Sequence, residues 1–317
     1  MTVHKILPTL LCIFPLAISA SEDFNSLKKL WDIRDDAEKI RLQDRMQVLV
    51  NQTPKKEFDT FDNNPAAKTT NPLLRFYDCN LDRLKKDIPA TQVKPGNVVI
   101  WYLYNMGFVI KTPTVCFGVD IHHRRAVELA DLLDFIVTTH NHDDHWSIPL
   151  LYTMTAKGKP VVSNFHPNAF YTKASAYTHN IAGVTIHCGE ADHNAKLKKF
   201  TMPMEIICPT GDRNFVFFTS GDCASESFLE RKSEKIHVYA VHPRCGMKAI
   251  KAARKLDPDV TFIVHLQEMG HPINYARWKI SDGRDEAAVF AADSRQFYLP
   301  VWGEKILWDG EKIYGGQ

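Results

Sequence analysis

The stretch Thr139-His140-Asn141-His142-Asp143-Asp144-His145-Trp146 directly follows an apolar run, Phe135-Ile136-Val137. Its core has the pattern H-x-H-x-D-H, which places three histidines and a carboxylate within six positions. Neutral imidazole and carboxylate oxygen are good ligands for zinc and similar divalent metals. Because a loop that leaves a buried strand can direct several side chains to one place, this stretch predicts a metal-dependent enzyme.

The spacing within this loop suits two metal ions. His140 and His142 are two residues apart and can reach one ion, whereas the adjacent Asp144 and His145 can point to a second centre. One short loop can therefore begin two sites about 3.5–4 Å apart, the separation typical of two-metal hydrolases. Because zinc takes about four ligands, the remaining ligands must come from other parts of the chain.

Candidate ligands also follow three later apolar segments, each at the polar exit of a predicted strand. The strands are predicted at residues 184–188, 215–219 and 260–264, and the ligands that follow them are His193, Asp222 and His265. Sites form at such strand ends in layered α/β folds.

Three of these positions have alternatives. His187 competes with His193, but it lies inside an apolar run, whereas His193 lies in a polar loop. His271 competes with His265, which directly ends a strand. Asp222 could instead be a turn residue, because Gly-Asp is common in turns. A further histidine, His242, is the one best suited to support a ligand from behind.

The order of these elements resembles the metallo-β-lactamase fold superfamily of hydrolases, from roughly Val98 to the C-terminus. Residues 101–110 look like the opening strands of that family, and residues 115–120 look like the strand whose terminal Asp120 supports the metal loop. The resemblance implies that one metal is held by His140, His142 and His193, that the second is held by Asp144, His145 and His265, and that Asp222 bridges both.

The residue at the bridging position narrows the branch within that superfamily. Antibiotic-degrading members usually have cysteine or serine there, so Asp222 indicates the lactonase, phosphodiesterase, glyoxalase and RNA-processing branches. The general pattern is most similar to the lactonase-like branch, which includes L-ascorbate-6-phosphate lactonase and the N-acyl-phosphatidylethanolamine phospholipase D relatives. The balance of 39 basic and 37 acidic residues counts against a nucleic-acid substrate, which favours a basic face.

The expected reaction is hydrolysis of an ester, lactone or phosphodiester bond in a small molecule. Two divalent ions, expected to be zinc, would lower the pKa of a shared water to about neutral and so generate a hydroxide nucleophile. Asp144 would orient the water or carry its proton, and Asp143 would face solvent. The expected pocket walls are Trp146, His271, Asn274, Tyr275 and the N-terminal extension. The alternatives are a di-iron redox enzyme and a non-catalytic binding protein on the same scaffold.

The fold class predicted from the order of strands and helices is α/β, a four-layer αββα sandwich over residues 95–317. A helical N-terminal extension is predicted over residues 21–94, with an irregular connection at 51–72 and a short helix at 82–87. Further helices are predicted at 124–133 and 247–256, and a hairpin at 301–314.

Residues 1–20 are predicted to be a secretory signal peptide. Lys5 precedes a mostly apolar segment, residues 6–18, and small residues suited to cleavage follow in Ala17-Ile18-Ser19-Ala20. The segment is too short for a comfortable membrane span. The expected location of the protein is therefore the periplasm or the outside of the cell.

Overall fold

The computed structural model describes residues 19–61, 70–172, 177–243, 245–275 and 277–315. Most of the predicted signal peptide, residues 1–18, therefore lies outside the described residues. Within the described part of the chain, no helix has the length and apolar character needed to cross a membrane.

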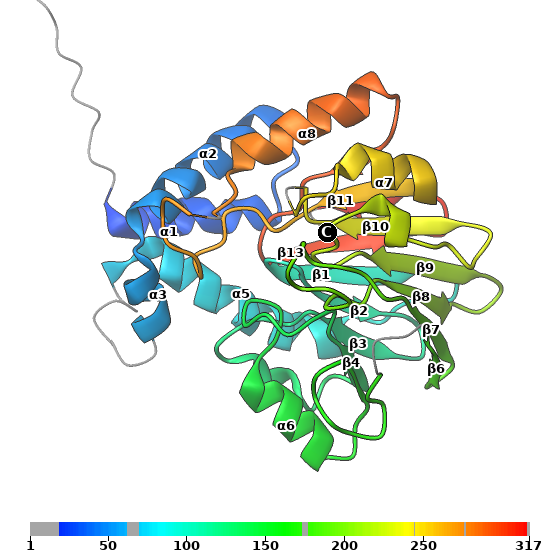
Figure 1. Cartoon of the computed structure of the whole chain (residues 1–317). Helices are drawn as coiled ribbons and strands as arrows, with labels where there is room; N and C mark the ends of the chain where they lie inside the picture. Colours follow the sequence, from blue (N-terminus) through cyan, green and yellow to red (C-terminus); the bar gives the residue numbers. More distant parts are fainter. Residues whose placement is uncertain (1–18, 62–69, 173–176, 244, 276, 316–317) are drawn as a thin grey trace, which may run out of the picture.

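Two seven-stranded sheets form the centre of the molecule (Figure 1). The first sheet has the order β14-β13-β1-β2-β3-β4-β5. Its strands are β1 (Val98–Tyr104), β2 (Gly107–Lys111), β3 (Cys116–Val119), β4 (Phe135–Val137), β5 (Val161–Val162), β13 (Glu304–Trp308) and β14 (Ile313–Gly315).

The second sheet has the order β12-β11-β10-β9-β8-β7-β6. Its strands are β6 (Tyr177–Ile181), β7 (Val184–Cys188), β8 (Met204–Pro209), β9 (Asn214–Thr219), β10 (Ile236–Val241), β11 (Pro258–Ile263) and β12 (Phe297–Tyr298). Strands β9 to β12 run parallel to one another, so their carboxyl ends lie at one edge of the sheet.

The inner faces of the two sheets pack against each other through aromatic side chains. The ring of Phe108 on β2 lies 5.3 Å from that of Phe217 on β9 and 6.2 Å from that of Phe262 on β11, measured between centroids. All seven residues of β1 are buried, as expected for a strand covered on both faces.

Helices cover the outer faces and complete the four layers. On the second sheet, α7 (Ala249–Leu256) and α8 (Ile280–Ala292) share an apolar cluster with Phe218 and Tyr239. On the side of the first sheet lie α5 (Pro72–Ala90), the 3₁₀ helix η3 (Ala126–Leu129) and α6 (Ile148–Ala156). The predicted αββα sandwich is therefore confirmed.

The helical prediction was less accurate at several places. Residues 124–133 form η3 followed by turns instead of a full helix. A physical reason is that the carbonyl groups of Ala130 and Leu133 accept hydrogen bonds from the Lys159 ammonium group. The helix expected at 82–87 is part of the 19-residue α5, and the connection at 51–72 contains the short helix α3 (Lys55–Thr60).

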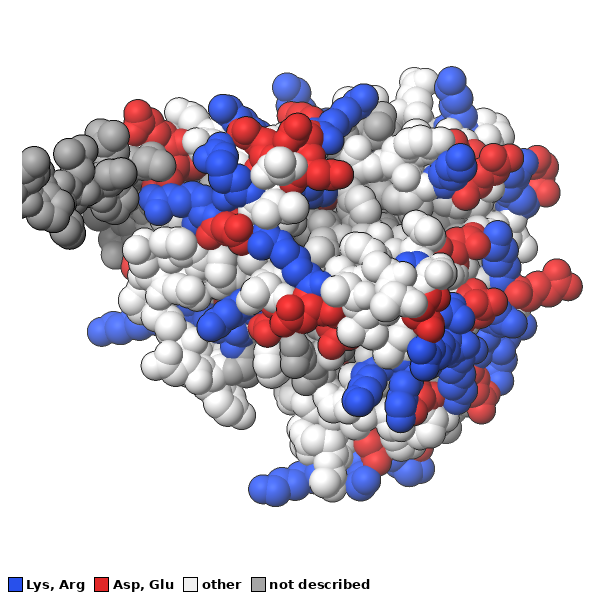
Figure 2. Space-filling model, turned by 90° about the horizontal axis from the view of Figure 1, so that it is seen from above, with Lys and Arg blue, Asp and Glu red and all other residues white. Residues whose placement is uncertain are grey.

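The segment before β1 is helical and shares the main apolar core with the sandwich. It comprises α1 (Ala20–Lys28), the 3₁₀ helix η1 (Lys29–Trp31), α2 (Asp36–Gln52), α3 and α5. The indole N–H of Trp31 donates to the carbonyl of Trp302 at 2.9 Å, which joins this segment to the end of the chain. Figure 2 shows that acidic and basic side chains are interspersed over the face seen from above.

Helix α2 also supports the loop that follows β11. Arg277 of this loop donates to the carbonyls of Val50 and Thr53, both at 2.8 Å. The Gln267 amide donates to the carbonyl of Gln43 at 3.1 Å. The N-terminal helices therefore fix the position of the loop that begins with His265.

Candidate metal centre

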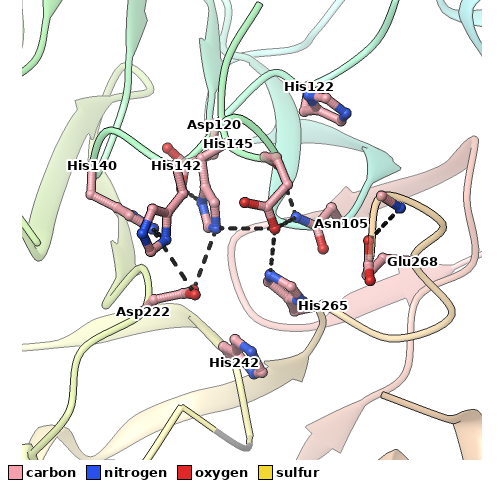
Figure 3. A network of polar contacts seen from close by, with 12 residues as sticks. Asn105, Asp120, His122, His140, His142, His145, Asp222, His242, His265 and Glu268 are labelled. Carbon is pink, nitrogen blue, oxygen red and sulfur yellow. Dashed lines mark hydrogen bonds and ion pairs between the residues drawn. The ribbon is translucent and has the colours of Figure 1, made fainter. Parts of the chain in front are cut away.

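The seven predicted ligands come together where the loops after β4, β7, β9 and β11 meet. Figure 3 labels His140, His142, His145, Asp222 and His265 among them. His140, His142, His193 and Asp222 form one group, in which the candidate ligand atoms all lie within 4.8 Å of one another. His140 Nε2 lies 3.2 Å from His142 Nδ1, and His193 Nε2 lies 3.5 Å from Asp222 Oδ2. Three imidazoles and one carboxylate suit a tetrahedral divalent ion.

A second group of candidate ligands lies beside the first. It consists of Asp144, His145 and His265, whose ligand atoms also lie within 4.8 Å of one another. His265 Nε2 is 3.1 Å and His145 Nε2 is 3.9 Å from Asp144 Oδ2. Asp222 faces this group with its other oxygen, because Oδ1 lies 3.4 Å from His145 Nε2. The two carboxylate oxygens of Asp222 therefore point to two different groups.

Some buried polar atoms of the centre form no hydrogen bond with the protein. Among the described residues, His145 Nε2, Asp222 Oδ1 and His265 Nδ1 are buried without a hydrogen bond. An unsatisfied buried polar group costs about 1–3 kcal/mol. A divalent cation between the groups would coordinate the first two of these atoms, so the residues present fit a metal ion.

A layer of residues behind the centre orients two of the imidazoles. Asp120, at the end of β3, accepts a hydrogen bond from His145 Nδ1 at 3.1 Å and another from the Thr139 hydroxyl at 2.7 Å. Thr139 Oγ1 lies 3.0 Å from His140 Nδ1. Because a protonated Nδ1 leaves the lone pair on Nε2, these contacts prepare both rings to bind a metal through Nε2.

Asn105, in the turn between β1 and β2, is a supporting residue that the sequence interpretation missed. Its side-chain N–H₂ donates to the backbone carbonyl of Asp144 at 2.9 Å and to Asp144 Oδ2 at 3.1 Å. The backbone carbonyl of Asn105 accepts a hydrogen bond from the backbone N–H of His265 at 3.0 Å. Asn105 has a φ of 58°, a conformation that asparagine adopts more readily than most residues. No motif surrounds it, so sequence spacing gave no signal for this role.

Close packing explains the glycine before Asp222. Gly221 has a φ of 49°, and a Cβ atom at this position would lie 2.7 Å from both the Cβ and the Oγ1 of Thr139. The loop carrying Asp222 can therefore approach the loop carrying His140 because position 221 has no side chain.

The electrostatics of the metal-free centre differ between the two groups. Desolvation holds the pKa of His140 well below 6.5 and also lowers the pKa of His142, so both rings are neutral. Burial would lower the pKa of His145 too, but the carboxylates of Asp144 and Asp222 raise it to about 10. Burial opposes ionisation of both aspartates, yet the neighbouring histidines hold the pKa of each well below 3.8.

A pocket of about 560 Å³ opens onto the centre. Besides candidate ligands, its lining includes residues from the loops after β4, β7, β9, β10 and β11: Asp143, Asn194, Leu197, Ala224, His242, Cys245, Gly246, His271, Tyr275 and Trp278. His271 and Tyr275 were expected to line it. Trp146, Asn274 and the N-terminal extension are not among its described lining residues, because the extension packs behind the loop after β11 instead.

The competing histidines lie apart from the ligand groups. His187 is on β7, where its Nδ1 lies 2.9 Å from the Thr178 hydroxyl, and it lines a different pocket. His271 lies 2.8 Å from the carboxylate of Glu268. Neither histidine belongs to a cluster that could hold a metal among the described residues.

His242 lies closer to the centre than the sequence interpretation expected. It forms a further cluster with Asp222 and His265, and its ring stacks on that of His265 at 4.0 Å between centroids. The Trp278 indole donates to His242 Nε2 at 3.0 Å, which occupies the lone pair of that nitrogen. Coordination through Nε2 would require Trp278 to move, so His242 fits a supporting role better than that of a ligand.

Comparison with known proteins adds little beyond the fold. No protein-family profile and no curated protein sequence matches the chain. Similar solved structures include Igni18, a metallo hydrolase from Ignicoccus hospitalis, with 16% identity, a TM-score of 0.49, and 67% of this chain and 98% of that chain covered. The metallo-β-lactamase fold protein YhfI from Bacillus subtilis is 12% identical, with a TM-score of 0.45 and coverages of 69% and 99%.

A third similar structure is CmlA, a diiron β-hydroxylase from Streptomyces venezuelae. It is 12% identical, with a TM-score of 0.49, and the match covers 69% of this chain but only 54% of CmlA. At these identities and TM-scores, the likenesses carry no argument about the reaction.

Proposed function

We propose that this protein is a dinuclear metal-dependent hydrolase that binds two divalent ions, most simply zinc, and cleaves an ester, lactone or phosphodiester bond of a small molecule. The observation that carries the proposal is the position of Asp222. Its Oδ2 lies 3.5 Å from His193 Nε2 in one group, and its Oδ1 lies 3.4 Å from His145 Nε2 in the other. A carboxylate between two groups of candidate ligands is suited to bridging two cations.

When bound, two divalent ions supply a hydroxide at neutral pH and stabilise negative charge that develops on the scissile group. The protein contributes fixed geometry. Asp120 and Thr139 hold the rings of His140 and His145 from behind, and Asn105 holds Asp144. Asp144 also lines the pocket, so we assign it the role of orienting the water or accepting its proton.

The pocket indicates a small substrate. Its volume of about 560 Å³ falls within the range of small-molecule sites. Leu197, Ala224 and Trp278 offer apolar surface, and Tyr275, with 72% of its surface exposed, lies at the rim. We choose lactones as test substrates because the order of candidate ligands resembles the lactonase-like branch of the superfamily.

We also propose that the protein is exported and acts on a small molecule and not on nucleic acid. The export proposal rests on the apolar N-terminal segment. Helix α1 begins at Ala20, and Ser19 caps it by accepting a hydrogen bond from the Glu22 backbone. Cleavage after Ser19 would remove this cap, so the first turn of α1 in the mature chain would be less stable, by about 1 kcal/mol.

Elemental analysis of metal per chain, paired with hydrolysis assays, tests the proposal. The substrates are bis-p-nitrophenyl phosphate and a panel of lactones. About two zinc ions per chain together with hydrolysis of either substrate class would support it. Two irons would indicate redox chemistry, and an absence of metal after reconstitution would indicate a binding protein.

Matched variants test the ligand set in the same experiment. His193→Ala and His265→Ala should each lower the metal content, whereas His187→Ala and His271→Ala should leave it unchanged. The reverse result would show that the wrong histidines have been assigned as ligands.

A further inference from the structure

A buried carboxylate lies beside the pocket, outside both groups of candidate ligands. The side chain of Glu268 is completely buried, and Glu268 lies next to the ligand network in Figure 3. Its Oε2 accepts a hydrogen bond from the Gly270 backbone N–H at 2.6 Å, and its Oε1 lies 2.8 Å from His271 Nδ1. A buried carboxylate without such donors would be costly, so these contacts fix the turn that carries His271.

The contact with Glu268 determines which edge of the His271 ring is presented to the pocket. Nδ1 is turned toward the buried carboxylate, so the opposite edge, with Nε2, is turned away from it. The side chain is 34% exposed and lines the pocket. Nε2 has no hydrogen-bond partner among the residues that the structure describes, which leaves this nitrogen for a ligand.

The charges around His271 favour its cationic form. The hydrogen bond with Glu268 raises the pKa of His271 above 6.5, and burial opposes this only in part. The carboxylates of Asp143 and Asp144 raise the pKa of His271 further. Arg277 donates to the His271 carbonyl at 2.6 Å, which helps to hold the turn that carries this ring. The imidazolium is therefore held between a buried partner and the open pocket.

We propose that His271 binds an anionic group of the substrate, a carboxylate or a phosphate, next to the metal centre, and that Glu268 is its positioning residue. The inference rests on the proposed hydrolase function and adds the substrate class. Among the described residues that line the pocket, none is a lysine or an arginine. Within the described lining, His271 thus offers a charged N–H to an anion outside the two groups of candidate ligands.

Kinetics with paired substrates test this assignment. The pairs are a neutral lactone and the same lactone with a carboxylate or a phosphate substituent, which also distinguishes the two anions. In His271→Gln, the KM for the charged substrate should rise about 10-fold, as expected for loss of a charge-assisted hydrogen bond. The KM for the neutral lactone should stay within about 2-fold. Glu268→Gln should give a smaller effect in the same direction, and His187→Gln is the matched control.

The pH profile adds a measurement that a merely structural role would not change. In the unaltered protein, the KM for the charged substrate should rise as pH increases through the pKa of His271, because the imidazolium loses its charge. In His271→Gln, this pH dependence should disappear. Equal changes of KM for charged and neutral substrates would overturn the assignment while leaving the hydrolase function in place.

A binding measurement separates failure of this inference from failure of the proposed function. Inorganic phosphate is titrated into the zinc-treated protein while the ring resonances of His271 are followed by NMR, with His271→Gln used to assign them. A shift of these resonances, reduced in Glu268→Gln, would support the anion site even if no substrate were hydrolysed. Unchanged resonances at saturating phosphate, or a His271 pKa at or below 6.5, would refute it.

Discussion

The two halves of the candidate metal centre are built differently. The half formed by Asp144, His145 and His265 is almost closed, with side-chain exposures of 10%, 0% and 3%. In the other half, His142 and His193 are only partly buried, and His193 has a side-chain exposure of 16%. The buried half therefore relies on protein contacts for its geometry, whereas the open half adjoins solvent and the pocket.

The supporting contacts also differ between the halves, although Asp120 reaches His140 of the open half through Thr139. Asp120 and Asn105 hold the buried half, and both have positive φ values, 45° and 58°. In the open half, Asn194 lies 2.9 Å from His193 Nδ1 with its amide nitrogen. An amide N–H donor at Nδ1 puts the proton of a neutral ring on Nε2, so His193 must exchange tautomers before it coordinates. The buried half is thus better preorganised, and the open half must adjust.

Removing the residue common to both halves should have the largest effect. Asp222→Asn removes the negative charge and replaces one oxygen with an N–H₂ group that cannot coordinate, so one ion loses a ligand and the other keeps only a neutral amide oxygen. We expect metal content to fall from about two ions to less than one, and hydrolysis to fall by about 10³-fold or more. Elemental analysis and initial rates measure both quantities. Asp212→Asn, an exposed aspartate, is the control, and retention of two ions in Asp222→Asn would refute the bridging role.

Removing a support should affect mainly the buried half. Asp120→Asn keeps an acceptor for the Thr139 backbone but loses the acceptor for His145 Nδ1. Loss of such a support typically weakens metal binding by about 10- to 100-fold. Titration against a chelator should show this weakening for one of the two ions. Asp134→Asn, which alters a carboxylate bound to the Cys116 backbone, is a control, and equal weakening of both ions would contradict the division into halves.

The pH dependence of metal binding should also separate the halves. The raised pKa of His145, about 10, means that an ion must displace a proton from this ring at neutral pH. Metal affinity of the buried half should therefore rise about 10-fold per pH unit up to about pH 10. The open half should change less, because the pKa values of His140 and His142 are lowered and their rings are already neutral.

Thermal unfolding tests the raised pKa of His145 in protein that has been treated with a chelator. Because the folded-state pKa of His145 is raised, its contribution to stability is complete below about pH 6.5 and is lost as pH rises through about 10. The difference in Tm between metal-loaded and chelator-treated protein should therefore be larger at pH 9 than at pH 7. A difference that narrows with pH would contradict the assigned direction.

The smallest expected effect is a gain in the metal affinity of the open half. Asn194→Asp keeps the side-chain oxygen that accepts from the Lys196 and Leu197 backbone, and it presents a carboxylate to His193 Nδ1. A carboxylate there favours the tautomer with a free Nε2 lone pair. We expect metal affinity of one ion to rise about 2- to 5-fold, measured by chelator competition. Weaker binding in this variant would show that the Asn194 contact does not hold His193 in the wrong tautomer.

Some regions of the structure could be predicted from the sequence better than others. The order of strands and the loop at 140–145 predicted the αββα sandwich and the seven residues that lie together, because strand ends converge at one edge of a layered sheet. Their roles as ligands remain a prediction. Asn105 could not be predicted, because its contact with Asp144 joins residues 39 positions apart and depends on a positive φ.

Tertiary contacts also explain the inaccurate helix predictions. The carbonyls of Ala130 and Leu133 accept hydrogen bonds from the ammonium group of Lys159, a partner that periodicity cannot reveal. Likewise, the described residues of the N-terminal extension do not line the pocket, because Arg277 ties α2 to the back of the loop after β11. Charge and helical pattern predict that such a segment exists, but they do not predict the surface against which it packs.

The hydrogen bonds between Arg277 and the carbonyls of Val50 and Thr53 affect when the centre can form during synthesis. The loop with His265 packs against helix α2, which is synthesised earlier. Strand β1 pairs with β13, Glu304–Trp308, which is synthesised much later. A chain still being synthesised thus holds the loop at 140–145 but no finished cage for an ion. We therefore expect metal to bind only after the loop after β11 has packed against α2, and a chain truncated before His265 to lack part of the second group of candidate ligands.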